Sequence, residues 1–248
     1  MICFGENGDR LEMMRSGQGS AVFYTTQWTL LRSAGDGAGL EELCRIYWRP
    51  LYGYARRRGM GAQDAEDVVQ EFFVNFLQAE RLQRLSPEQG KLRAYLLAGL
   101  KGHIAGWRRS ALRKKRGGGA THLSLDYESA EALLELDAGT SPEAAYDADW
   151  ARTLLDHVLL RLQQQFANEG GAGRFELLNG YLIGSAQRGD FSEIAEELGI
   201  SIGAARVAVH RLRRRFRETL MQELARTLDS PEAAEEELAS LFVALGRG

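Results

Sequence analysis

Apolar residues recur at three- and four-residue spacing along most of the chain, which is the periodicity of amphipathic helices. The alternation of apolar and polar residues that is typical of strands is nearly absent. The clearest helix is predicted over Gln63–Gln78, whose apolar side chains fall on one face: Val68, Val69, Phe72, Phe73, Phe76 and Leu77. The pattern therefore predicts an all-α fold.

The helical pattern falls into two blocks, which we interpret as two small domains. Residues 25–116 form the first block, with a kink or break expected at Pro50, because proline interrupts helical hydrogen bonding. Residues 149–230 form the second. Between them, residues 117–148 begin with three glycines and are strongly acidic, so we expect a flexible linker. We expect residues 1–24 to be a disordered extension.

A last amphipathic helix is predicted within a C-terminal extension, residues 231–248. Its apolar side carries Leu238, Leu241, Phe242 and Leu245, and acids lie on the other side. We expect this helix to dock on the second block, since amphipathic helices usually bury their apolar stripe within their own chain. Binding of a regulator by the same stripe is the alternative.

Within the second block, residues 190–217 show the pattern of a helix-turn-helix. Asp190 is a candidate cap for the first helix, with Glu193 completing a capping box. Gly199 suits the tight turn, and Ser201 is a candidate cap for the second helix. One face of that helix is predicted to be buried and the opposite face is basic. The expected buried stripe is Ala205, Val209, Leu212 and Phe216.

The distribution of charge says more than the net charge of -3. Residues 101–116 and 206–217 carry Lys and Arg without any acid. The charged residues of 126–149 are all acidic, and residues 229–237 carry further acids. Two basic blocks on an otherwise acidic chain predict contact with a polyanion at two places. No apolar run approaches the length of about 20 residues that a membrane-spanning helix needs, so we expect a cytoplasmic protein with no membrane partner.

Two sets of residues resemble bacterial sigma factors. Phe191–Ser201 followed by Val207–Arg214 closely resembles their C-terminal promoter-reading domain. Tyr47–Tyr52, Asp64–Phe73 and Arg93–Leu97 resemble their N-terminal helical domain. Two such domains and no others, over residues 25–228, are similar to the extracytoplasmic-function (ECF) group of the sigma-70 family.

This resemblance implies that the chain binds core RNA polymerase and directs promoter recognition and melting. In the family, the N-terminal domain binds the β′ clamp helices and opens the −10 element, while the C-terminal domain reads the −35 element and touches the β flap. The resemblance also implies an anti-sigma factor or another regulator as a further partner. The residues that correspond to polymerase-facing positions are Asp64, Glu66, Asp67, Gln70 and Glu71.

The resemblance also assigns residues to promoter DNA. Those expected at the −10 element are Lys91, Arg93, Lys101, His103, Trp107, Arg108 and Arg109. Those expected at the −35 element are Ser201, Gly203, Ala204, Arg206, His210, Arg211, Arg213, Arg214 and Arg217. Trp107 and Tyr95 are candidates for stacking on flipped bases, with a place in the core as the alternative. The acidic linker suggests the hypothesis that it mimics nucleic acid in the channels of the polymerase.

Two other classes of function remain open at this point. A helix-turn-helix regulator that does not direct the polymerase would explain the second block, but it would not need the Asp64–Phe73 segment. An enzyme with Mg²⁺ on Asp64, Asp67 and Glu71 would lack a convergent histidine, nucleophile or phosphate-binding loop. We therefore predict neither an enzyme nor a cofactor or metal.

Overall fold

A computed structural model of the protein describes residues 37–77, 91–111, 126–132, 134, 139–182, 191–225, 228 and 231–246. Every regular element within these ranges is a helix, so the prediction of an all-α fold is confirmed there. The predicted disordered extension, the glycines at 117–119 and Asp190 lie outside the described residues.

Three helices form the N-terminal group, and they are α3 (Gly37–Arg57), α4 (Ala62–Phe76) and α6 (Leu92–Ala111). The aromatic face predicted for α4 is buried against α3 and α6. The break expected at Pro50 does not occur, because α3 continues through it. Pro50 is buried, and the packing of α3 against α8 (Pro142–Asn168) stabilises a helix that lacks one hydrogen-bond donor.

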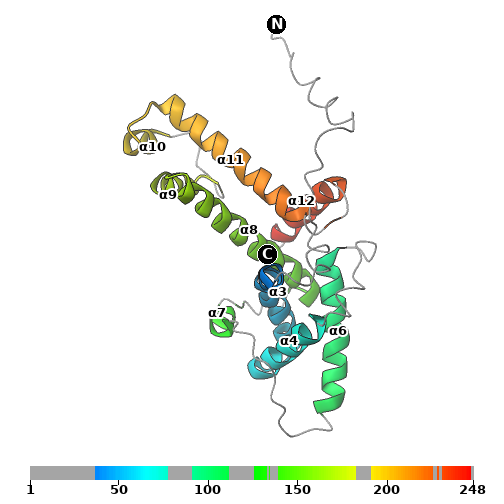
Figure 1. Ribbon diagram of the computed structural model, residues 1–248. Coiled ribbons are helices and arrows are strands. Elements are labelled where there is room, and N and C mark those ends of the chain that lie inside the picture. Colours follow the sequence, from blue (N-terminus) through cyan, green and yellow to red (C-terminus); the bar gives the residue numbers. More distant parts are fainter. Residues whose placement is uncertain are drawn as a thin grey trace.

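The long helix α8 connects the N-terminal group to the rest of the molecule (Figure 1). It begins earlier than the expected start of the second block at Asp149, because Ser141 caps it and Pro142 occupies its first turn. The Ser141 side chain accepts a hydrogen bond from the Ala144 amide at 3.2 Å. The first half of α8 packs on α3, and its other end contacts α9 (Ala172–Asn179) and α11 (Ile202–Ala225).

A glycine of α3 lies beside an ion pair between α3 and α8. A Cβ atom at Gly53 would lie 2.8 Å from Nη1 of Arg57 and 2.9 Å from Oδ2 of Asp149. These two side chains form a salt bridge of 2.6 Å between the helices. Gly53 therefore leaves room for an ion pair that joins the two predicted blocks.

Helices α7 and α12 pack on the helices already described. Helix α7 (Tyr127–Ala132) lies in the segment expected to be a linker, and it packs on α3. Helix α12 (Pro231–Leu245) packs against α8 and α11, as its apolar stripe suggested. Leu238 and Leu241 are buried there, but Phe242 is 59% exposed, so the predicted stripe is only partly covered.

Buried apolar side chains form one connected cluster that reaches from α3 to α12. The expected pair of domains therefore packs together in this structure, and the division at the predicted boundaries stays a prediction. Among the helices that the structure describes, none has the length and apolar character needed to cross a membrane.

Candidate nucleic-acid interface

The segment predicted to be a helix-turn-helix consists of α10 (Ser192–Glu197), a turn and α11. Gly199 has a φ of +62°, a left-handed conformation that favours glycine, as the sequence predicted. The Ser201 hydroxyl oxygen accepts a hydrogen bond from the Ala204 amide at 3.2 Å, which caps α11. The cap position of α10 is Phe191 rather than Asp190, and the Phe191 side chain makes no capping hydrogen bond.

Helix α11 buries one face and exposes the face predicted to meet DNA. Ala205, Val209 and Leu212 are at most 2% exposed, and Phe216 is half-buried. All nine residues predicted for the −35 element are exposed, and they are Ser201, Gly203, Ala204, Arg206, His210, Arg211, Arg213, Arg214 and Arg217. The structure thus leaves this basic face open to a partner.

Several arginines of α11 are oriented by contacts within the chain. The Arg206 guanidinium lies 5.6 Å from the ring centroid of Phe191, which is an attractive cation–π arrangement. Arg213 donates from Nε to the Tyr181 carbonyl at 3.0 Å. Arg217 pairs with Glu235 of α12 at 2.9 Å. The aromatic ring of Phe191 and the Tyr181 carbonyl were not predicted, because their proximity to α11 depends on how the helices pack.

The surface of α4 is acidic where the sequence predicted polymerase contacts. Asp64, Asp67 and Glu71 are exposed, and Glu66 is half-buried. Gln70 differs from this group, because it is 3% exposed and donates from Nε2 to Oε1 of Glu66 at 3.1 Å. In this arrangement Gln70 supports the α4 surface from within, while the three exposed carboxylates are accessible.

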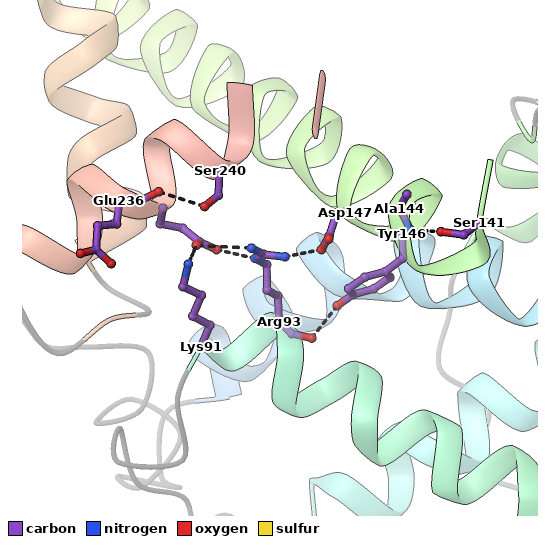
Figure 2. Close-up of polar contacts among 9 residues, drawn as sticks. Lys91, Arg93, Ser141, Ala144, Tyr146, Asp147, Glu236 and Ser240 are labelled. Carbon is purple, nitrogen blue, oxygen red and sulfur yellow. Dashed lines mark hydrogen bonds and ion pairs between the residues drawn. The ribbon is translucent and has the colours of Figure 1, made fainter. Parts of the chain in front are cut away.

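Three cations predicted for the −10 element pair with acids from later in the chain. Figure 2 draws two of them, Lys91 and Arg93. Lys91 pairs with Glu237 of α12, and Arg93 pairs with both Glu237 and Asp147. Lys101 pairs with Glu143 of α8 at 2.8 Å. These acids surround the first half of α6, so the predicted DNA-binding cations are engaged within the protein.

The ion pairs of Glu237 and Glu143 lower the pKa of their carboxyl groups. Burial of Glu237 by itself would raise its pKa, but hydrogen bonds from Arg93 and Lys91 outweigh burial and hold the pKa below its usual value. The Lys101 ammonium lowers the pKa of Glu143, and the same contact raises the pKa of Lys101. The carboxyl groups of Glu237 and Glu143 are therefore charged at neutral pH.

The remaining residues predicted for the −10 element lie along the second half of α6. His103 places Nε2 at 3.8 Å from Oε2 of Glu71, and Trp107 is half-buried against the core. Arg108 and Arg109 are exposed and donate to the carbonyls of Arg58 and Ala105. Tyr95 is also half-buried, and its ring centroid lies 6.3 Å from that of Phe76. Both aromatic rings thus combine core packing with partial access to the surface.

The acidic partners of α6 are the functional residues that sequence reasoning missed. Asp147 and Glu143 were counted with the acidic linker, and Glu237 with the acidic side of the last helix. The alternation of basic and acidic blocks was the available signal. Blocks of charge show that pairing will occur, but they do not show which side chains meet.

Within the ranges described, no group of three or more His, Cys, Asp or Glu side chains is arranged to hold a metal ion.

Comparison with family models gave a match within the N-terminal group. Residues 43–114 match the family model described as sigma-70 region 2. No curated protein and no solved structure gave a significant match. The region 2 match covers α4 and α6, and it supports a sigma factor of the sigma-70 family that acts in RNA polymerase binding and promoter melting.

Proposed function

We propose that this protein is a sigma factor of the ECF group, which binds core RNA polymerase and recognises promoters in the cytoplasm through two separate surfaces. The region 2 segment holds the polymerase and opens the −10 element. The helix-turn-helix of α10 and α11 reads the −35 element. Core polymerase and promoter DNA are its partners, and an anti-sigma factor is a further expected partner.

One observation carries this proposal. The chain that matches sigma-70 region 2 also has a helix-turn-helix whose nine predicted DNA-facing positions are all exposed. A reading helix presents the side chains of its first turns to base edges, while cations farther along contact phosphates. Arg206 and His210 lie in those first turns, and the arginines at 211, 213, 214 and 217 follow.

The acidic surface of α4 is the proposed contact for the polymerase. Asp64, Asp67 and Glu71 are exposed on a helix whose opposite face is buried. Exposed carboxylates on a rigid helix are suited to a basic partner, because charge complementarity speeds association and fixes register. Gln70 contributes by hydrogen bonding to Glu66 rather than by direct contact.

Run-off transcription with purified core polymerase tests the proposal. The template is a library of genomic fragments, and the transcript ends are sequenced. We expect the protein to add a set of start sites that share upstream elements at fixed spacing. Core polymerase alone is the control, and it should initiate without such elements.

The result separates a sigma factor from a regulator of another kind. A helix-turn-helix regulator would bind duplex DNA without enabling core polymerase to initiate at promoters. Specific duplex binding without any promoter-dependent transcript would therefore contradict the proposal. Loss of the new start sites in Arg206→Ala, with core binding retained, would support the role of α11.

A further inference from the structure

Glu237 is placed as an internal counter-ion. Its side chain is 2% exposed, although the neighbouring Glu235 and Glu236 are exposed on the same helix. Burying a carboxylate is costly unless it is paired and hydrogen-bonded. Glu237 meets this need by pairing with Lys91 and by accepting hydrogen bonds from Arg93, one of them at 3.4 Å from Nη2.

Arg93 is shared by α12 and α8, whereas Lys91 pairs with Glu237 of α12. Arg93 spreads its guanidinium between Glu237 and Asp147, and its Cζ lies 4.9 Å from the ring centroid of Trp150. Figure 2 shows Arg93 pointing toward Asp147. Its own carbonyl accepts a hydrogen bond from the Tyr146 hydroxyl at 2.9 Å. Both the side chain and the backbone of Arg93 are therefore held by residues of α8 and α12.

Carboxylates in these positions make the contacts that DNA phosphates would make. An arginine guanidinium donates hydrogen bonds to carboxylate and to phosphate oxygens in the same planar, bidentate geometry, and a lysine ammonium binds either group as a point charge. A side chain whose donors are engaged by Glu237 and Asp147 cannot offer the same donors to a phosphate. DNA and the acids of α8 and α12 therefore compete for the cations of α6.

The contact is also bordered by open space. A hollow of about 520 Å³ lies beside Arg93, between α8 and α12, and is lined by Asp147, Ala144, Ala239, Ser240 and Val243. On this side the ion pairs border a hollow rather than tightly packed side chains. Close packing makes separation costly, so its absence here favours a contact that can open.

We propose that α12 is an intramolecular latch, in which Glu237 masks Lys91 and Arg93 from promoter DNA. Asp147 of α8 also covers Arg93, and Glu143 of α8 covers Lys101. The first half of α6 becomes available to DNA when these acids separate from it. By thermodynamic reciprocity, DNA that binds α6 weakens the hold of α12. The latch rests on the proposed function, because it assigns Lys91 and Arg93 to DNA.

The direct test is the affinity of Glu237→Gln for a labelled single-stranded oligonucleotide of random sequence at low salt. Glu236→Gln is the matched control, because it removes the same charge from the same helix at an exposed position. We expect Glu237→Gln to bind about tenfold more tightly than the wild type, a gain in the usual range for coupled sites. Glu236→Gln should change affinity by less than about twofold, because a lone exposed charge is largely screened. Equal affinities for the two variants would overturn the latch.

A double variant shows whether the gain runs through the masked cation. Lys91→Gln combined with Glu237→Gln should lose most of the gain. A gain that is undiminished without Lys91 would contradict the masking. Circular dichroism and thermal denaturation establish that each variant is folded.

Glu143→Gln provides a second test if Glu237→Gln does not fold. The Glu143 side chain is 45% exposed and its partner is Lys101, so the substitution is mild. We expect about a threefold gain in oligonucleotide affinity, the effect of freeing one phosphate-binding cation. No gain would overturn the mask at this position.

Transcription separates failure of the latch from failure of the proposed function. If the wild type directs promoter-dependent transcripts but Glu237→Gln gains no affinity, the latch is wrong and the function stands. If neither protein directs transcripts from any fragment, the proposed function is wrong and the latch falls with it. Promoter-dependent transcripts together with the gain support both.

Discussion

The Tyr146 hydroxyl of α8 donates a hydrogen bond of 2.9 Å to the carbonyl of Arg93 in α6. Tyr146 is fully buried, so this bond lies inside the contact between the region 2 segment and the helices that follow. It shows that α6 and the first part of α8 share an interior in this structure. The closed arrangement is therefore held by polar contacts as well as by apolar packing.

Substituting Tyr146 tests how much this bond contributes. Tyr146→Phe keeps the ring and leaves the Arg93 carbonyl without its buried donor, so we expect a loss of about 1 kcal/mol in the free energy of unfolding. Tyr146→Ala should cost about 3–5 kcal/mol, because it also opens a cavity. Urea denaturation measures both. Tyr181→Phe is the control at the far end of the molecule, and a loss there equal to that of Tyr146→Phe would contradict the assignment.

Removing a buried acid of α11 should lower the free energy of unfolding more than removing an exposed acid of the same helix. Glu223 is 2% exposed and pairs with Arg161 of α8, whereas Glu218 is exposed and lies 3.4 Å from Arg214. Glu223→Ala leaves Arg161 without its partner, and since Arg161 is partly solvated we expect a loss of about 1–3 kcal/mol. Glu218→Ala should cost less than about 1 kcal/mol. Thermal denaturation ranks the two, and the reverse order would refute the argument.

Acidification should loosen the closed arrangement. Hydrogen bonds from Arg56 and Tyr52 lower the pKa of Glu131 in α7, and the pKa of Glu237 is lowered as well. Both groups bind protons more weakly in the folded state than in the unfolded chain. Their contribution is therefore present above the ordinary pKa of 4.5 and is lost as the pH falls through the lowered values.

The measurement is the melting temperature between neutral pH and about pH 3. We expect a fall in the wild type that begins near the ordinary carboxyl pKa. The double variant Glu131→Gln with Glu237→Gln should start lower and fall less steeply, because two of the linked groups are gone. Parallel curves for the two proteins would contradict the assignment.

Specific reading of DNA should depend on the exposed face of α11. Arg206→Ala and His210→Ala are each expected to reduce discrimination between −35 sequences by about 1–3 kcal/mol where the side chain meets a base. Arg215→Ala is the matched control, because Arg215 of the same helix bonds to Glu169 at 2.9 Å and faces Phe166. Equal losses on all sequences would assign Arg206 and His210 to phosphates.

Polymerase binding should depend on the exposed acids of α4. Reversing Asp67 and Glu71 to lysine is expected to weaken binding to core polymerase by at least about tenfold, because the variant sets like charges against a basic partner. Duplex binding by α11 should persist. Glu176→Lys, an exposed acid of α9, is the control for charge reversal elsewhere. Unchanged core affinity in the double variant would refute the α4 contact.

Local features of the fold were readable from the sequence. The aromatic face of α4 and the apolar stripe of α11 follow from helical periodicity, which is a property of neighbouring residues. Glycine at position 199 predicts the turn, because glycine readily adopts the positive φ found there. Serine at position 201 predicts the cap, because its hydroxyl oxygen can accept a hydrogen bond from a free backbone amide. The same local reasoning failed at Pro50, where packing against α8 outweighs a missing hydrogen bond.

The candidate site was readable only in part. Exposure of the basic face of α11 follows from its position opposite the buried stripe. The burial of Gln70 could not be foreseen, because it lies beside three exposed acids on the same helix and only the surrounding packing distinguishes it. The exposure of Phe242 is a similar case, since an apolar residue in a stripe is covered only where a partner helix reaches it.

The sequence by itself determined the helices, their buried faces and the presence of a helix with a basic outer face, because these depend on residues a few positions apart. It also determined that acidic and basic blocks alternate. Only the tertiary structure decided which charges meet, since Arg93 and Glu237 are 144 positions apart and are joined by the packing of α6, α8 and α12. Coulomb attraction is strong at short range and in a buried setting, so the pairing follows from the packing and not from the order of residues.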